Sequence, residues 1–406
     1  MIWSNFLHIY QPPEQNKDIV NRITFESYRP IISTLKNNQK ARLTLNINAC
    51  LTEQLIQHGH GDLVSDMRGL LHSGQLELTE SAKYHALLAL LPEAEIRRQI
   101  QLNRETHQNI FGEIYQPKGF FIPEMAYSRK VADIVADMGY KWIIISEISL
   151  GGKQNSNINA SQTYHLKGNP DFKVFFRSQR ISDLIHRQGI KNAANFFSEA
   201  KKKSGGNGYF ITAMDGEVYG HHRSGYEKFL RQLYANKSIE FLTISKIAEK
   251  YPISAEIEPV SASWSALEED LSANIPYSLW NHPDNPIHKK QWELTNLAMN
   301  VINECKNDLE FKSARAKLDA ALFSCQYWWA SSIPWWKLEM IEMGASMLKS
   351  AINLLEQPPA GSKEKAESLY NEIMAAAFNW ENSGKARANA EYYTKKISQE
   401  LGEYVP

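Results

Sequence analysis

The sequence has little cysteine, no excess of charge of either sign and no long apolar run. Its three cysteines, among 406 residues, lie far apart with no Cys-x-x-Cys pair, which provides no metal or redox motif and favours a reducing compartment. Basic and acidic residues number 45 each, so no net field attracts nucleic acid or an anionic membrane. No apolar stretch approaches a membrane span, and the first residues read as a strand rather than a signal peptide. We therefore expect a cytoplasmic protein without a nucleic-acid partner, a membrane partner or a cofactor.

The residues that are abundant describe a large globular protein. The chain is 43% hydrophobic and 22% charged, which argues against disorder. Its 18 Tyr, 16 Phe and 10 Trp exceed what a core needs. Aromatic rings stack on the faces of sugars, although a large core also holds them, so each ring has both interpretations.

The first 260 residues alternate short apolar runs with longer amphipathic stretches. The runs that predict strands are 2–9, 42–48, 76–79, 119–122, 141–146, 173–177, 208–214 and 239–242. Helical patterns at 63–71, 93–111 and 128–138 lie between them, and Ser128 is a plausible N-cap. This alternation predicts an α/β fold with a parallel sheet, and seven or eight strands favour closure into a barrel.

The pattern changes near residue 251. Residues 1–260 are expected to form the barrel domain, 261–286 an irregular linker that contributes to the cleft, and 287–406 a C-terminal helical bundle. The helices expected there are 287–305, 311–328, 335–355, 361–378 and 385–401.

Two apolar runs end abruptly in an acidic residue, Glu124 in one and Asp215 in the other. Two carboxylates at the ends of buried strands would supply the nucleophile and the acid of glycoside cleavage. Glu217, two residues after Asp215, would raise its pKa by like-charge proximity if both side chains point the same way. The alternative is that Asp215 belongs to an ordinary turn and that Glu124 stabilises the first turn of a helix.

These runs belong to five stretches that occur in the order found in glycoside hydrolase family 57, and the chain resembles that family over most of its length. The stretches are His8–Pro13, Gly74–Glu80, Phe121–Tyr127, Asp215–His222 and the Trp-rich segment Ser324–Ser332. The resemblance implies an incomplete TIM-like (β/α)7 barrel followed by a helical domain. It also implies a retaining mechanism on an α-glucan or oligosaccharide, with Glu124 as the nucleophile and Asp215 as the general acid/base.

The chain departs from the family's usual pattern at two positions. Tyr10 stands where the first stretch usually has a second His, and Phe121 stands where the third usually has Trp. These departures bear on the sugar that is bound more than on the class of reaction. The residues expected to bind substrate are His8, Tyr10, Gln11, Glu77, Phe121, Glu217, His221, Trp264, Gln326, Trp328 and Trp329.

Two other functions remain open at this point. A metal-dependent polysaccharide deacetylase has a related barrel topology and would bind zinc, and a non-catalytic sugar-binding protein could keep the fold. We expect no metal site, because the adjacent His221 and His222 diverge on a strand or a helix. Hydrolysis and sugar transfer share one glycosyl-enzyme intermediate, and the pattern predicts no oligomeric state.

Overall fold

The chain forms two compact units. The computed structural model describes residues 1–154, 156, 158–187, 189–190, 192–252 and 254–401. The first unit comprises Met1–Lys83 and Leu88–Glu268, and the second comprises Tyr84–Leu87 and Glu269–Pro406. Residues 261–268 of the expected linker therefore belong to the first unit, and 269–286 belong to the second. None of the helices in the described part of the chain is long and apolar enough to cross a membrane.

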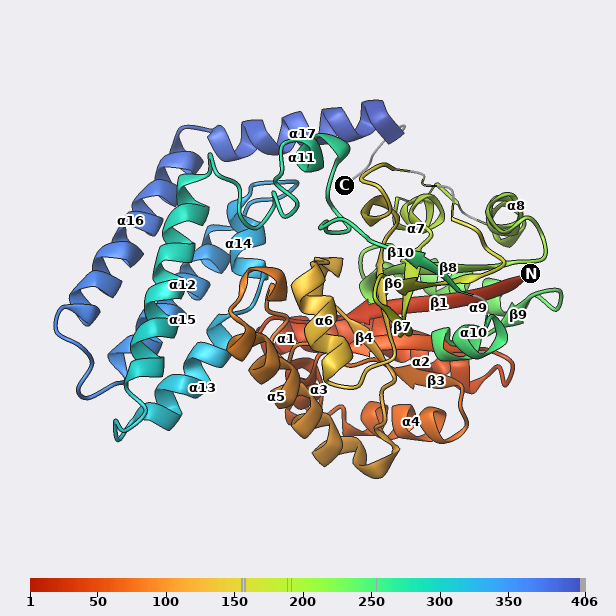
Figure 1. The fold of residues 1–406 in the computed structure, drawn as a ribbon, viewed down its shortest axis with the longest axis horizontal. Helices are drawn as coiled ribbons and strands as arrows, with labels where there is room; N and C mark the ends of the chain where they lie inside the picture. Colours follow the sequence, from red (N-terminus) through yellow and green to blue (C-terminus); the bar gives the residue numbers. More distant parts are fainter. Residues whose placement is uncertain (155, 157, 188, 191, 253, 402–406) are drawn as a thin grey trace. The chain divides into compact units, whose positions relative to one another are not determined.

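The strands of the first unit form two sheets, and helices surround them (Figure 1). In the first sheet the order is β3-β2-β1-β8, all parallel, and β9 pairs with the start of β1. In the second the order is β10-β6-β7-β5-β4. The strands are β1 (Ile2–Ile9), β2 (Leu43–Ile47), β3 (Leu76–Leu78), β4 (Gly119–Phe121), β5 (Trp142–Ser146), β6 (Thr163–Leu166), β7 (Asn169–Arg177), β8 (Tyr209–Asp215), β9 (Glu240–Phe241) and β10 (Ser254–Ile257).

The two sheets join at both ends into an incomplete barrel. On one side Glu80 continues β3 and pairs with β4, because its N–H donates to the Gly119 carbonyl and its own carbonyl accepts from Phe121 N, each at 2.9 Å. On the other side Ser178 N donates to the Ile211 carbonyl at 2.7 Å. The seam between β7 and β8 stays short because β6 pairs antiparallel with the edge of β7 opposite β5. The barrel strands are therefore β1, β2, β3, β4, β5, β7 and β8.

Each predicted strand is present in the described residues, but two observed strands were not predicted. The pairs among the predicted strands are parallel as expected, whereas β6, which was not predicted, is antiparallel to β7. The other unpredicted strand, β10, lies between the last predicted strand and the expected linker 261–286.

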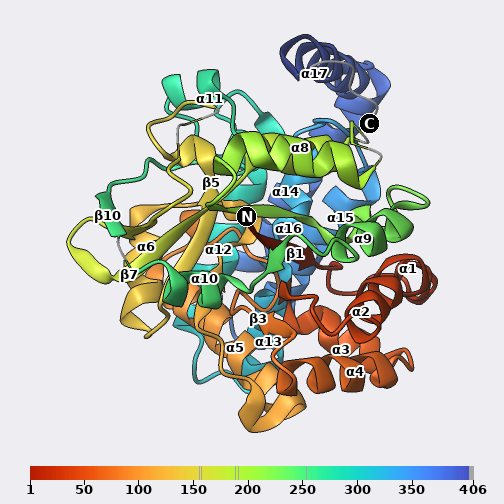
Figure 2. The same cartoon turned by 90° about the vertical axis from the view of Figure 1, so that its right-hand side faces the viewer.

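Helices of the first unit follow most barrel strands, as a βα repeat requires. Ser128 caps α6 as predicted, with its side chain accepting from Val131 N. Figure 2 shows α8, α9 and α10 around the start of β1. The helices are α1 (Lys17–Ile23), the π-helical turn η1 (Thr24–Tyr28), α2 (Arg29–Lys36), α3 (Ala49–Gln57), α4 (Gly61–His72), α5 (Glu93–Phe111), α6 (Arg129–Asp137), α7 (Gln179–His186), α8 (Ala193–Ser204), α9 (Tyr226–Tyr234) and α10 (Ile244–Lys250).

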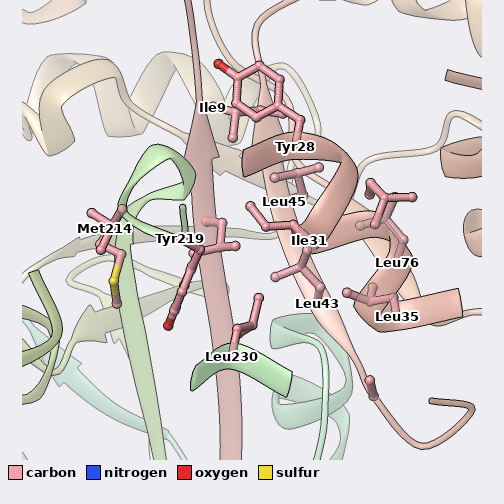
Figure 3. Packing of buried hydrophobic residues seen from close by; sticks show 14 of the residues in the cluster. Ile9, Tyr28, Ile31, Leu35, Leu43, Leu45, Leu76, Met214, Tyr219 and Leu230 are labelled. Carbon is pink, nitrogen blue, oxygen red and sulfur yellow. The ribbon is translucent and has the colours of Figure 1, made fainter. Parts of the chain in front are cut away.

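The barrel has one core inside the strands and another outside them. The inner core is closed at the amino ends of the strands by Ile244 and Ile247 of α10. Its strand residues include Phe6, Phe121, Trp142, Phe175 and Ile211. The outer core packs the backs of β1, β2 and β8 against helices, and Figure 3 shows part of it. This two-sided burial explains why the strands read as continuous apolar runs.

The second unit is helical. Helix α12 packs against α15 and α16, and α15 packs against α13 and α14. The single helix expected over 311–328 is wrong, because it is interrupted where Phe323 pairs with Ala86. The helices are α12 (Pro286–Glu304), α13 (Phe311–Ala321), α14 (Cys325–Ala330), α15 (Leu338–Asn353), α16 (Ser362–Asn382) and α17 (Lys385–Leu401), while α11 (Glu268–Ser272) begins at the junction of the units.

Candidate active site

The inner faces of the barrel strands change from apolar to polar at their carboxyl ends. Side chains alternate along a strand, so His8 lies on the same inward face of β1 as Phe6, and Asp215 lies on the same face of β8 as Ile211. The strand register pairs His8 directly with Asp215. Arg177, two residues after the inward Phe175, ends β7 on the same face. A polar layer therefore lies on top of the apolar interior.

His8 is held as a neutral imidazole of one tautomer. Its Nδ1 lies 2.7 Å from Asn46 Oδ1, and the Asn46 amide N–H donates to Thr79 Oγ1 at 3.2 Å. With the Asn46 amide placed in this way, its Oδ1 accepts from His8, so His8 Nδ1 carries the hydrogen. Burial lowers the pKa of His8 to about 4. The Nε2 atom of His8 is consequently an acceptor, which suits a sugar hydroxyl.

Glu124 lies on a strained turn after β4. Its φ of 62° and the φ of 45° at Met125 are left-handed values that non-glycine residues seldom adopt. Residues 262–264 hold this turn from the other side. Tyr127 N donates to the Ala262 carbonyl at 2.8 Å, and Trp264 N donates to the Glu124 carbonyl at 3.2 Å.

The carboxylate of Glu124 also has a side-chain donor. The indole N–H of Trp264 donates to Glu124 Oε2 at 3.0 Å. Trp264 therefore holds Glu124 at two points: its backbone N–H donates to the Glu124 carbonyl, and its indole N–H donates to the Glu124 carboxylate. An N–H donor favours the ionised form of a carboxylate, which is the form that a nucleophile requires.

Aromatic rings connect Glu124 to the layer that contains Asp215. The Phe121 ring stacks on His8 with their centroids 4.8 Å apart, and Trp264 lies 6.0 Å from Phe121 and 6.2 Å from His8. His8 is in turn the strand neighbour of Asp215. The two predicted catalytic carboxyl groups therefore border one continuous set of packed side chains.

Asp215 and Glu217 form a coupled acidic pair. Burial raises the pKa of both groups, and the charge of Asp215 raises the pKa of Glu217 further. The nearby Arg177 guanidinium acts in the opposite direction on Asp215. Arg177 itself donates to the Ala213 carbonyl and to Asp183, which keeps its position fixed. The pair thus retains a proton that either residue alone in water would lose well below neutral pH.

Three of the residues expected to bind substrate are held by other contacts in the structure. Glu77 points into the barrel, but it lies one layer of side chains nearer the amino ends of the strands than His8. There it accepts from Thr44 Oγ1 and from Ser245 N at the start of α10. The residue that contacts His8 is Asn46. Phe121 has no exposed surface, and its ring stacks on His8. Gln326 is also fully buried, and its amide donates to the Ala321 carbonyl within the second unit.

The other expected binding residues remain predictions. Tyr10 is half-buried beside His8, and Gln11 is buried against Glu217. His221 Nδ1 lies 2.5 Å from Glu26 Oε2. Trp328 and Trp329 belong to α14 in the second unit, where they are half-buried and pack edge to face at 4.9 Å.

Asn46, Arg177 and Tyr28 belong to the site although the sequence did not single them out as binding or catalytic residues. Asn46 and Arg177 could have been found, because each is the inward residue at the carboxyl end of a predicted strand. Tyr28 lies outside the barrel strands, and its hydroxyl donates to Glu217 Oε1 at 2.5 Å. Among the described residues, no three His, Cys, Asp or Glu side chains form a group that could hold a metal ion.

Comparison of the sequence with known proteins identifies relatives. Residues 4–258 match the family model described as glycosyl hydrolase family 57. A protein named putative alpha-amylase from Methanocaldococcus jannaschii is 25% identical over 65% of this chain and 59% of its own length. A 4-alpha-glucanotransferase from Thermococcus litoralis is 20% identical over 66% of this chain and 41% of its own length. The chain thus spans less than two thirds of the length of these relatives.

Solved structures share the fold at lower identity. The crystal structure of the 4-alpha-glucanotransferase from Thermococcus litoralis gives a TM-score of 0.67 at 16% identity, covering 86% of this chain and 60% of that one. A GH57 branching enzyme from Thermococcus kodakaraensis gives 0.66 at 16% identity, covering 93% and 96%. The family model matches well over half of the residues, and the fold agrees with it. This chain therefore belongs to glycosyl hydrolase family 57.

Proposed function

We propose that this protein is a retaining glycosidase or transglycosylase that acts on α-glucans or α-linked oligosaccharides, with Glu124 as nucleophile and Asp215 as acid/base. The observation that carries the proposal is the pair of opposite environments. Glu124 accepts an indole N–H that favours its charge, whereas burial raises the pKa of Asp215 and favours its protonated form. One carboxyl group that favours the ionised form and one that favours the protonated form match the nucleophile and the general acid of double displacement.

The first step transfers the sugar to the protein. Glu124 attacks the anomeric carbon, the bond from that carbon to the leaving oxygen breaks, and Asp215 gives its proton to that oxygen. The raised pKa of Asp215 keeps the proton available near neutral pH. The neutral His8, with Nε2 as acceptor, would bind a hydroxyl of the same sugar.

The second step releases the sugar with its original anomeric configuration. Asp215, now ionised, takes a proton from water or from a sugar hydroxyl, and the oxygen so activated displaces Glu124 from the anomeric carbon. Water as acceptor gives hydrolysis, and a sugar gives transfer. The choice between the two depends on how well the site excludes water.

The function is tested by incubating the protein with maltooligosaccharides, amylose, pullulan and, as negative controls, galactosides. We expect products only from the α-glucans, either shortened or redistributed in length. The anomer formed first, followed by proton NMR, should be α. An initial β-anomer would show inversion and would reject the proposed nucleophile.

Replacing Trp264 with Phe should lower kcat more than it changes KM. The variant keeps an aromatic ring but loses the N–H that donates to Glu124 Oε2. A hydrogen bond to a charged group contributes about 1.5–3 kcal/mol, so we expect a loss of about 10- to 100-fold in kcat, measured with a maltooligosaccharide.

Trp292→Phe is the matched control. Trp292 is a partly buried indole of the second unit that donates to one carbonyl, that of Trp280, at 3.0 Å. This variant should keep the wild-type kcat. Equal losses of kcat in both variants would show that the bond from Trp264 to Glu124 is not the cause of the loss. A change in KM alone for Trp264→Phe would show that the indole of Trp264 binds sugar without orienting Glu124.

A further inference from the structure

α1 and α2 are joined by one π-helical turn, η1. The sequence explains why this turn forms. Pro30 has no N–H, so the Glu26 carbonyl cannot receive its α-helical hydrogen bond. The backbone instead bonds from Arg29 N to the Thr24 carbonyl, five residues back. Single π-helical turns of this kind often occur at functional sites.

This π turn is packed against the loop that follows Asp215. Ser27 Oγ donates to the Gly216 carbonyl at 2.8 Å, and Tyr28 donates to Glu217 at 2.5 Å. The Glu26 carbonyl lies so close to Gly220 that a Cβ there would come within 1.9 Å of it. Gly220 also has a φ of 121°, so only glycine allows this contact. Backbone and side-chain contacts together fix the register of the turn on the loop.

The hydroxyl of Tyr28 is aimed at the acidic pair. Figure 3 shows its ring beside Ile9 at the carboxyl end of β1, whereas the hydroxyl of Tyr219 points toward the other end of that strand. Glu217 Oε1 also receives Gln11 Nε2 and Tyr10 N, each at 3.4 Å, so all three donors converge on one oxygen. Three donors stabilise a negative charge on Glu217.

We propose that Tyr28 is a positioning residue for the acid/base: by donating to Glu217 Oε1 it stabilises a negative charge on that carboxyl group and so shifts the proton of the pair toward Asp215. This inference rests on the proposed function of Asp215. The other groups that face the pair do not favour a proton on Asp215 over one on Glu217. Arg177, paired with Asp183, lies near Asp215 and favours its charged form, and His8 is neutral.

The test is the pH dependence of Tyr28→Phe. Without the hydroxyl, Glu217 binds the shared proton more readily, so Asp215 loses its own at lower pH. The kcat/KM of the variant relative to wild type should be near one at about pH 4 and should fall about tenfold by about pH 7.5. A purely structural defect would lower the ratio equally at every pH.

Two further variants isolate the cause. Tyr219→Phe removes a buried hydroxyl without a described hydrogen-bond partner on the same loop, and its ratio to wild type should not depend on pH. Glu217→Gln removes the charge itself, so adding Tyr28→Phe to it should produce no further pH-dependent loss. A full additional loss in the double variant would overturn the inference.

Carbon-13 NMR of the Asp215 carboxyl, assigned with Asp215→Asn, provides a readout that needs no turnover. Asp215 should titrate about one pH unit lower in Tyr28→Phe than in wild type. An unchanged titration rejects the role of Tyr28 even if the protein cleaves α-glucans by way of Glu124 and Asp215. A shifted titration in a protein without activity on any glucan supports the role of Tyr28 and rejects the proposed function.

Discussion

Glu124→Ala should abolish turnover of α-glucans, with a loss of about 10⁴-fold or more in kcat, because in the proposed mechanism Glu124 is the group that forms the covalent intermediate. The substitution also leaves the Trp264 indole N–H without its carboxylate acceptor and opens space beside it. Azide should enter this space and restore part of the rate with an activated α-glycoside such as the fluoride. Because azide then attacks from the side that Glu124 occupied, the product should be the β-glycosyl azide.

The anomer of the azide product makes this experiment specific. Asp215→Ala, treated in the same way, should give the α-glycosyl azide, because azide there attacks the intermediate that Glu124 has already formed. If Glu124→Ala keeps the wild-type rate, or if both variants give the same anomer, the assignment of the two carboxyl groups is wrong.

Asp215→Asn should discriminate between leaving groups. The amide has nearly the same shape but has no proton to give, so natural glucans should be cleaved about 10²- to 10⁴-fold more slowly. An aryl glycoside with a very acidic phenol leaves without assistance, and its first step should be nearly unaffected. The pH dependence due to Asp215 should disappear together with the carboxyl group.

Asp171→Asn is the control for the loss of one acidic group. Asp171 is exposed on β7, and its substitution should leave both substrates unaffected. A loss in Asp215→Asn that is equal for poor and good leaving groups would contradict the role of general acid.

The sequence predicted the barrel strands well because burial on both faces produces a signal that does not depend on partners. Runs such as 2–9 and 141–146 need only be apolar and flanked by turns. β6 and β10 were missed because each has only four residues and includes polar ones, such as His165 in β6 and Glu256 in β10. β10 is also half-exposed. The break in the helix expected over 311–328 depends on a pairing of Phe323 with a residue 237 positions earlier, Ala86, which no local pattern contains.

The candidate site divides in the same way. The acidic residues at strand ends can be predicted from the sequence. Asn46 and Arg177 could have been predicted as well, because side chains alternate between the two faces of a strand and both residues fall on the inward face. Glu77 was misplaced because alternation gives the face but not the height, and it lies one layer below Thr79. Tyr28 required knowledge that a π turn and the loop after Asp215 meet, and this contact spans 189 positions.

The hydrogen bond from Trp264 to Glu124 affects where this protein can be cut into separate domains or joined to other proteins. The stretch that matches the family model ends at residue 258, yet the indole that touches Glu124 lies six positions further on. A segment excised at the end of that match would contain every barrel strand and both carboxyl groups, but the strained turn at Glu124 would have lost its contacts with residues 262–264. The smallest transplantable module therefore reaches at least to residue 264, so its border is set by the contacts of residues 262–264 with this turn rather than by the last strand.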